Sequence, residues 1–454
     1  MTFFQNYATL ILIITTTKPG ENNYAVYRSH RQPWNTGNHP PFLQLCGRPP
    51  DESRLQSAYI VSEMLKPYFH DDARKIRDVC FLALLHDIGA YKTDEISKML
   101  QFDTDDVLAH SVYGYLFIKY FSPLKKLAGA ILLHHAAWQV LENLEAFPEE
   151  IRLLAQVLHA ADRIDVAMEV QHLTWEETLA LLKKDSGTNF APVITDLAAA
   201  CDFHTPFEGN NDAEAVFFQM LSEIPLTQDE ITDYLKMLIF TIDFRSRHTV
   251  THTITTTTIS SELAKRMGLS EKECNQVVCG SMLHDLGKIG IPVEILEYPG
   301  KLSPQAMNIM RTHVDITEKI FGDVIEETVK YLALRHHEKL DGSGYPRGLT
   351  AADLNTGERI VAIADIISAL SGTRSYKTAF SKDRICSIIT EMKDDGLIDA
   401  DIVELMISDY DEIMEATRIQ CQPILDIYAR IQQDFDRISR AMTMDDIAGM
   451  KTVF

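Results

Sequence analysis

Imidazole and carboxylate side chains gather in one part of the chain, between residues 248 and 365. Six of the 16 histidines fall between residues 248 and 337. The side chains that could act as metal ligands are His252, His284, Asp285, His313, His336, His337 and Asp365. Such groups suit borderline divalent metals such as iron, manganese, nickel or zinc. Seven ligands exceed the four of a tetrahedral site, so the set predicts two octahedral ions that share Asp285 as a bridge.

The alternative for any single histidine is a hydrogen-bonded structural role. Apolar runs precede both His284 and His336, which places these polar groups at the ends of buried segments. A buried polar group needs a partner, and a metal would supply one. His248 lies four residues before His252, so one helical face would present both, and His248 is a candidate extra ligand.

Three cationic residues are candidates for binding phosphate. Lys288 lies four residues past His284, a helical spacing at which its ammonium group could reach over the metals. Arg374 and Lys377 follow Asp365 by nine and twelve residues, and their side chains are suited to phosphate oxygens. The alternatives are a surface lysine at 288 and a solvated cationic face at 374–377.

The chain contains a diverged internal repeat. The dipeptide His-Asp occurs at 86–87 and at 284–285, each time after an apolar run. Later landmarks recur in the same order, namely His110, His134, His135 and Asp162 in the first copy and His313, His336, His337 and Asp365 in the second. The first copy lacks a match for His252, and Ala90 replaces the lysine. We therefore expect a structural or regulatory first copy, with residual metal binding left open.

The second copy resembles the HD-GYP family of cyclic-dinucleotide phosphodiesterases, a branch of the HD superfamily, over about residues 245–410. The resemblance rests on the motifs His284-Asp285-x-Gly287-Lys288 and His336-His337-Glu338-x-x-Asp341-Gly342-x-Gly344-Tyr345-Pro346. It implies an all-helical fold, a di-iron or di-manganese centre that is sometimes trinuclear, and cleavage of cyclic di-GMP or 3',3'-cGAMP to a linear dinucleotide.

The resemblance carries over residue by residue. The family's metal positions fall on His252, His284, Asp285, His313, His336, His337 and Asp365, and its phosphate positions fall on Lys288, Arg374 and Lys377. Two positions depart from the family pattern. Trinuclear members carry Glu where this chain has His248, and family members often carry Asp in place of Ser368, which would alter substrate placement. The first copy resembles a degenerate HD domain, an arrangement similar to that of some 3',3'-cGAMP phosphodiesterases.

These observations predict a metal-dependent phosphodiesterase, a phosphoric diester hydrolase, that opens a cyclic dinucleotide to a linear 5'-phosphorylated dinucleotide. Asp285 would hold both ions, and Lys288 would stabilise charge on the phosphoryl oxygens. One alternative is an HD scaffold that senses a nucleotide without turnover, and the complete ligand set argues against it for the second copy. The other is a nucleotide phosphohydrolase acting on monophosphates, and the Gly-Tyr-Pro loop argues against that.

Helices must position these residues. Apolar residues recur at three-to-four spacing in 76–85, 278–283 and 360–370, whereas strand-type alternation is rare. We expect an all-α fold with an irregular segment at 1–50, a degenerate HD domain at 51–225, an HD-GYP catalytic domain at 226–410 and a C-terminal helix at 411–454.

Thr227 and Glu230 form a capping-box pattern that opens a helix toward Phe244. Glycines and a proline predict a loop at 341–348.

The C-terminal stretch carries an apolar stripe from 424 to 442. Pro423 should break or kink this helix near its start. The stripe either packs on the helix's own domain or forms a homodimer interface.

Composition limits the partners. The chain has 454 residues and a net charge of -22, with a pI near 5.1, so it should repel long nucleic acids and anionic membranes. The seven cysteines are scattered, with no C-x-x-C pair, which is typical of a reducing compartment. No apolar run approaches the roughly 20 residues of a membrane span. We expect a cytoplasmic enzyme whose partner is a small anionic substrate.

Overall fold

The computed structural model describes residues 53–69, 72–89, 107–201, 203, 219–220, 223–245, 251–298, 300–322, 325–372 and 379–441. Within these ranges the chain is almost entirely helical and forms no β-strand beyond two isolated bridges. The prediction of an all-α fold is confirmed. The predicted site residues His248, Arg374 and Lys377, like the segment 1–50, lie outside the described residues.

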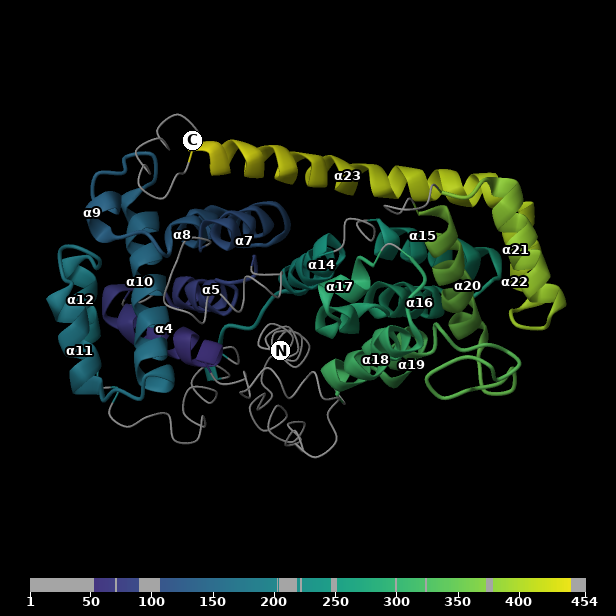
Figure 1. Ribbon diagram of the computed structural model, residues 1–454, viewed down its shortest axis with the longest axis horizontal. Helices are drawn as coiled ribbons and strands as arrows, with labels where there is room; N and C mark the ends of the chain where they lie inside the picture. Colours follow the sequence, from purple (N-terminus) through teal and green to yellow (C-terminus); the bar gives the residue numbers. More distant parts are fainter. Residues whose placement is uncertain are drawn as a thin grey trace. The chain divides into compact units, whose positions relative to one another are not determined.

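The chain forms two compact units, residues 1–237 with 430–454, and residues 238–429. In the first unit the helices are α4 (Ser53–Phe69), α5 (Ala73–Leu84), α7 (Val107–Phe121), α8 (Ala128–Leu133), α9 (Trp138–Leu141), α10 (Glu149–Asp165), α11 (Trp175–Lys184) and α12 (Pro192–Ala200). A short 3-10 helix, η1 (Lys125–Leu127), precedes α8, and a π-helical turn, η2 (Val166–Val170), follows α10. Helix α10 packs on both α4 and α8 (Figure 1).

The second unit holds α15 (His252–Arg266), α16 (Glu271–Leu283), the 3-10 helix η3 (Leu286–Gly290), α17 (Val293–Leu296), α18 (Pro304–Phe321), α19 (Glu327–Leu334), α20 (Thr356–Ser371), α21 (Lys382–Asp394) and α22 (Ala400–Ser408). Helix α15 lies against both α16 and α20. The core of this unit is built from apolar residues three or four apart, such as Ile259 and Leu263 on α15 and Ile360, Ile363 and Ile367 on α20, all nearly fully buried.

Two helices have residues in both units. Helix α14 (Gln228–Arg245) opens with the predicted capping box, in which the Glu230 amide donates to Thr227 Oγ1 at 3.2 Å and the Thr227 amide donates to Glu230 Oε2 at 2.8 Å. Helix α23 (Tyr410–Ala441) covers the described part of the predicted C-terminal helix, and it continues through Pro423 without the predicted break. Proline has no backbone N–H, so one carbonyl in the preceding turn lacks its helical hydrogen bond. Pro423 is exposed, and water can bind to that carbonyl.

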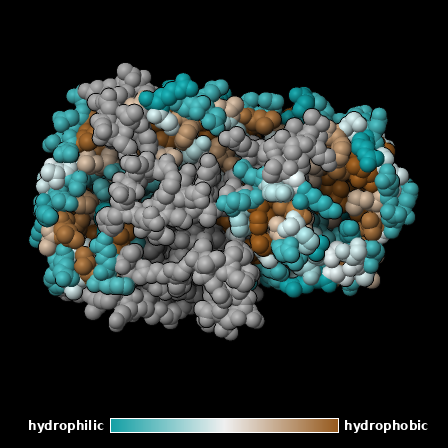
Figure 2. Space-filling model, viewed as in Figure 1, coloured by the Kyte–Doolittle hydropathy of each residue, from teal (hydrophilic) through white to brown (hydrophobic). Residues whose placement is uncertain are grey.

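The predicted repeat appears as five helices in the same order, α4, α5, α7, α8 and α10 in the first unit and α15, α16, α18, α19 and α20 in the second. The His-Asp pair follows α5 in one unit and α16 in the other. Figure 2 shows hydrophilic side chains spread over much of the described surface, with hydrophobic ones between them. No described helix has the length and apolar character needed to cross a bilayer.

Candidate metal centre

A tight turn after α16 places His284 and Asp285 close to His313. Helix α16 ends at Leu283, His284 caps it, and the chain then enters the 3-10 helix η3. At Gly287 an added Cβ would lie 1.9 Å from the carbonyl oxygen of His313 on α18, so only glycine allows this approach. The Gly287 amide also donates to Thr317 Oγ1 of α18 at 2.8 Å. The turn is thereby fixed against the helix that carries His313.

Backbone carbonyls orient three of the histidines. In each case Nδ1 lies within hydrogen-bond distance of the carbonyl oxygen three residues earlier: His284 to Ser281 at 2.6 Å, His313 to Met310 at 2.7 Å and His336 to Ala333 at 2.6 Å. A carbonyl only accepts hydrogen bonds, so Nδ1 carries the proton in the neutral ring. The Nε2 lone pair then points to the centre, as metal ligation requires.

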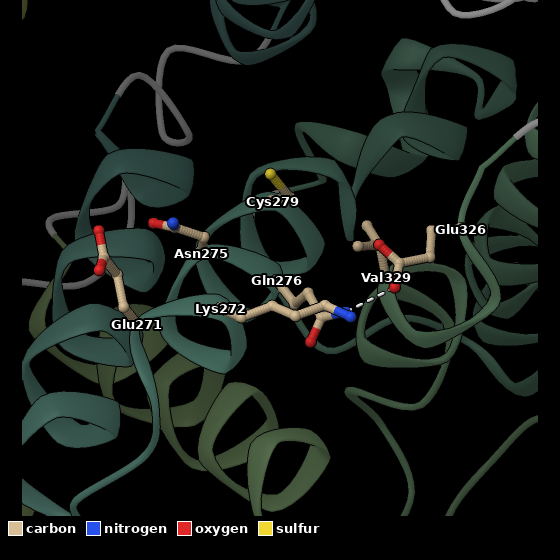
Figure 3. A pocket seen from close by; sticks show the side chains of 7 residues that line it. All are labelled: Glu271, Lys272, Asn275, Gln276, Cys279, Glu326 and Val329. Atoms are coloured by element: carbon tan, nitrogen blue, oxygen red, sulfur yellow. Dashed lines mark hydrogen bonds between the residues drawn. The ribbon is translucent and has the colours of Figure 1, made fainter.

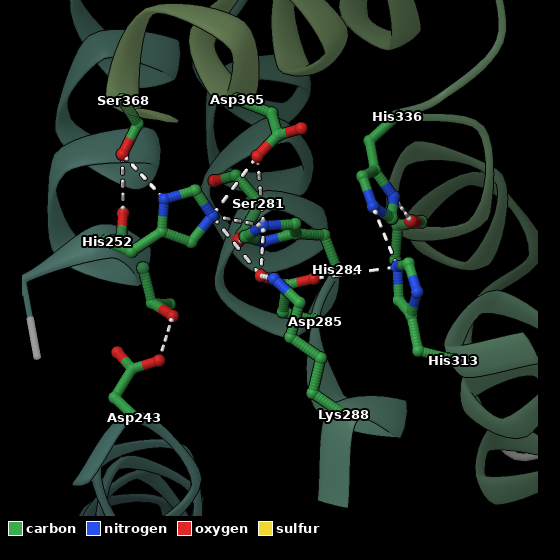
Figure 4. A network of polar contacts seen from close by, with 12 residues as sticks. Asp243, His252, Ser281, His284, Asp285, Lys288, His313, His336, Asp365 and Ser368 are labelled. Carbon is green, nitrogen blue, oxygen red and sulfur yellow. Dashed lines mark hydrogen bonds and ion pairs between the residues drawn. The ribbon is translucent and has the colours of Figure 1, made fainter. Parts of the chain in front are cut away.

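The first half of the centre joins α15, the α16 turn and α20 (Figure 4). His252 Nε2 lies 3.3 Å from His284 Nε2. Asp285 Oδ2 lies 3.2 Å from His252 Nε2 and 3.1 Å from His284 Nε2. Asp365 Oδ1 lies 3.1 Å from His252 Nε2 and 3.7 Å from His284 Nε2. Four predicted ligands therefore converge on one point.

The second half shares the Asp285 carboxylate. His313 Nε2 lies 3.4 Å from His336 Nε2 and 3.6 Å from Asp285 Oδ1. His337 extends this half toward α20, with its Nδ1 3.5 Å from Asp365 Oδ2. The two oxygens of Asp285 thus face opposite halves of the centre. That is the geometry expected of a bridging carboxylate.

Two observations indicate that these residues fit a pair of metal ions. Ligand atoms 2.0–2.2 Å from an ion lie about 3 Å from one another, and the spacings within the two halves run from 3.1 to 3.7 Å. Asp285 Oδ1 is buried and accepts no hydrogen bond from any described residue. A buried oxygen of this kind is costly without a partner, and a cation would supply one.

The first half of the centre stabilises charged groups. Burial alone would lower the pKa of His284, but the charge of Asp285 and hydrogen bonds to Asp285 and Asp365 raise it to about 10. The pKa of His252 is raised in the same way, against burial, by Asp285 and Asp365. Burial would raise the pKa of Asp285, yet the neighbouring His284 and Lys288 hold it well below its usual range. Without metal, protons on the imidazoles balance these carboxylates.

The second half favours neutral imidazoles. Burial lowers the pKa of His313 to about 4 and that of His337 to about 3. Burial and the neighbouring His337 hold the pKa of His336 well below its usual range. These rings are therefore in the form that binds metal at neutral pH.

Lys288 lies beside the bridging carboxylate. Its ammonium group forms an ion pair with Asp285 Oδ2, and its side chain is 20% exposed. The spacing of four residues from His284 predicts that both residues lie on one continuous α-helix. Lys288 instead lies on the 3-10 helix η3. From this position it can meet an anion that approaches the centre from solvent.

The predicted loop at 341–348 is held against the His336-His337 pair. Buried Glu338 accepts hydrogen bonds from the amides of Arg347 at 2.7 Å and Leu349 at 2.9 Å. The Tyr345 amide donates to the His337 carbonyl at 3.1 Å, and the two rings lie 4.6 Å apart. The loop therefore lines the second half of the centre.

Sequence reasoning missed the role of Ser368. The sequence predicts an effect of this position on substrate placement, but its hydroxyl lies 2.9 Å from His252 Nδ1 and donates to the His252 carbonyl at 3.1 Å. Ser368 is three residues past Asp365 on α20, and this spacing was the available signal. The serine orients a ligand, as the backbone carbonyls do for His284, His313 and His336.

A separate pocket of about 450 Å³ lies at α16 and α19, lined by Glu271, Lys272, Asn275, Gln276, Cys279, Glu326 and Val329 (Figure 3). Within it Gln276 Nε2 donates to Glu326 Oε1 at 2.6 Å. None of its residues belongs to the ligand set.

Comparison with family models matches residues 236–402 and residues 55–167 each to an HD domain. The chain is 27% identical to 3'3'-cGAMP-specific phosphodiesterase 1 of Vibrio cholerae, over 72% of this chain and 80% of that protein. It is 34% identical to the cyclic di-GMP phosphodiesterase response regulator RpfG of Xanthomonas campestris, over 36% of this chain and 44% of that protein.

A solved structure has a similar fold. The crystal structure of a cyclic GMP-AMP specific phosphodiesterase of V. cholerae, V-cGAP3, superposes with a TM-score of 0.51 at 17% identity. The match covers 90% of this chain and 97% of that one. This chain therefore has a fold similar to that of V-cGAP3.

Proposed function

We propose that this chain, which belongs to the HD-domain family and carries two such domains in tandem, hydrolyses a cyclic dinucleotide with its second domain. The observation that carries the proposal is the seven-residue ligand set around the shared carboxylate of Asp285. The relatives named above, which act on 3'3'-cGAMP or cyclic di-GMP, support the same chemistry. The activity is that of a phosphoric diester hydrolase.

Two divalent ions would be held by His252, His284, Asp285, His313, His336, His337 and Asp365. Iron or manganese suits this mixture of imidazole and carboxylate best, and nickel or zinc is compatible with it. When bound, such ions supply Lewis acidity to a phosphoryl oxygen and lower the pKa of water.

The chain's own residues supply charge and orientation. Lys288, next to Asp285, would move from this ion pair to a phosphoryl oxygen and stabilise the charge that develops there. Arg374 and Lys377 are proposed to hold the second phosphate of the substrate. The product would be a linear dinucleotide with a 5' phosphate, formed in the cytoplasm. His248 remains a candidate ligand for a third ion.

Between the two substrates, 3',3'-cGAMP is the one that we favour. The alignment with the 3'3'-cGAMP-specific relative spans 72% of this chain and so includes residues of both domains. The alignment with the cyclic di-GMP relative spans only 36% of it. The alignment that includes both domains supports testing 3',3'-cGAMP first.

The test is turnover of 3',3'-cGAMP and cyclic di-GMP by the full chain with Mn²⁺. The double change His284→Ala and Asp285→Ala should lower kcat by at least about a thousandfold, because both halves lose ligands. His86→Ala, at the matching position of the first domain, serves as the control and should keep most of the activity. Unchanged turnover in the double variant would refute the proposal, and hydrolysis of nucleoside monophosphates alone would favour a phosphohydrolase.

A further inference from the structure

The first unit contains a second cluster of metal-ligand side chains. Asp87, His110, His134 and His135 each offer a ligand atom, and these atoms all lie within 4.8 Å of one another. Asp87 follows the end of α5, His110 lies on α7, and the two histidines follow α8. They occupy the places that Asp285, His313, His336 and His337 hold in the second unit, which form the second half of its centre.

One spacing within the cluster matches its counterpart in the second unit: His110 Nε2 lies 3.7 Å from Asp87 Oδ1, and His313 Nε2 lies 3.6 Å from Asp285 Oδ1. His110 Nε2 also lies 3.0 Å from His135 Nε2. The turn is also built in the same way, since a Cβ at Gly89 would lie 2.0 Å from the carbonyl oxygen of His110. Half of the dinuclear geometry is therefore present in the first unit.

His134 points an unsatisfied nitrogen into this cluster. Its Nδ1 lies 2.6 Å from the carbonyl oxygen of Ile131 and so carries the ring proton. Its Nε2 is a bare acceptor, and the side chain is fully buried. No described residue donates a hydrogen bond to that nitrogen. The fixed tautomer and the missing donor are what a metal ligand requires.

The other half of the centre is incomplete in the first unit. Helix α4 begins at Ser53, whereas α15 begins at His252. Asp162, the counterpart of Asp365, is bound by the Arg163 guanidinium at 2.6 and 3.1 Å. The second unit has Ile366 where the first has Arg163. The guanidinium partly neutralises Asp162, and no residue matches His252, so this half lacks one ligand and part of its negative charge.

We propose that the first unit binds a single divalent cation through Asp87, His110, His134 and His135. Three imidazoles and one carboxylate complete a four-coordinate site of the kind that Zn²⁺ or Co²⁺ occupies. A site closed by four protein ligands stabilises a fold and leaves no position for a substrate. The ion would join α5, α7 and α8 and has no part in the hydrolysis proposed for the second unit.

Co²⁺ is the probe, because a four-coordinate site gives it strong visible absorption. The full chain with His284→Ala, Asp285→Ala and His336→Ala lacks ligands from both halves of the second centre. This chain should still bind about one Co²⁺. Adding His134→Ala should abolish the visible band or raise the Kd at least tenfold. His159→Ala is the matched control, because this ring lies 6.3 Å from that of His135 and is outside the cluster.

A second variant covers the case in which His134→Ala does not fold. His135 is only partly buried, and His135→Ala should cause the same loss while circular dichroism shows a helical chain. The inference is overturned if the folded triple variant binds no Co²⁺, or if its Co²⁺ band survives both His134→Ala and His135→Ala. The measured quantity is bound metal. If the first unit binds no Co²⁺, the proposal of hydrolase activity in the second unit is unaffected. If turnover is lost while Co²⁺ binding remains, the metal site in the first unit is unaffected.

Discussion

At the scale of single residues, the centre depends on how each imidazole is held. His284, His313 and His336 use the carbonyl three residues earlier, which is always present at such a position along a helix. His252 is the first residue of α15 and takes the Ser368 hydroxyl instead. A side-chain partner can be changed without altering the backbone, so Ser368 offers a direct test of orientation.

Ser368→Ala should weaken metal binding by the second unit by about tenfold to a hundredfold, the usual effect of removing a partner of a ligating histidine. The measurement is a Mn²⁺ titration of the full chain, followed by turnover at saturating Mn²⁺. Ser371→Ala is the control, since its hydroxyl donates to the Ser368 carbonyl and not to a ligand. An unchanged Mn²⁺ affinity in Ser368→Ala would show that the serine has no orienting role.

Metal uptake should release protons. The pKa of His284 is raised to about 10 and that of His252 is also raised, so both rings bind protons more tightly than a free imidazole when no metal is present. A cation must displace these protons, and its affinity should therefore increase as the pH rises through neutrality. Calorimetric titration with Mn²⁺ in two buffers of different ionisation enthalpy measures the release. Equal heats in both buffers would contradict it.

At the scale of elements, each His-Asp pair depends on close contact between its turn and the next ligand helix. Gly287 meets α18 and Gly89 meets α7, in both cases at the carbonyl of the histidine that holds the same place in the repeat. The contact explains why both turns carry glycine at the same point. It also couples the position of Asp285 to that of His313.

Gly287→Ala should displace η3 from α18, because the new methyl group would overlap the His313 carbonyl. Overpacking of this kind costs about 1–3 kcal/mol of stability, and turnover should fall more than tenfold as the ligands move apart. Gly300→Ala is a suitable control, since its nearest neighbour is the Tyr298 ring at 3.3 Å. Urea unfolding and kcat are the measurements. Wild-type values for Gly287→Ala would show that the approach is not required.

At the scale of the whole molecule, an acidic chain concentrates its chemistry in one domain. The net charge is -22, and the ligands of the second unit come from five separate segments of sequence. An ion bound there draws these segments together only in the folded state. Metal should therefore contribute to stability by mass action, by about 2.7 kcal/mol at a hundredfold excess over Kd.

Chelation should accordingly lower the unfolding temperature of the full chain, and Mn²⁺ should restore it. Differential scanning calorimetry measures the shift, with metal content checked in each sample. The His284→Ala and Asp285→Ala variant should respond less than the wild type. An unfolding temperature that does not change after the metal has been removed would contradict this role.

The sequence by itself determined the helical class and predicted the repeat and the candidate ligand set, because helical periodicity and ligand chemistry are local properties. His284, Asp285, His313, His336, His337 and Asp365 could be named from their types and order alone. Orientation could not be predicted, since the tautomer of each ring depends on a partner that only folding supplies. Tertiary structure showed that Ser368 of α20 holds His252 of α15, because this pair forms between two helices whose relative rotation the sequence does not specify.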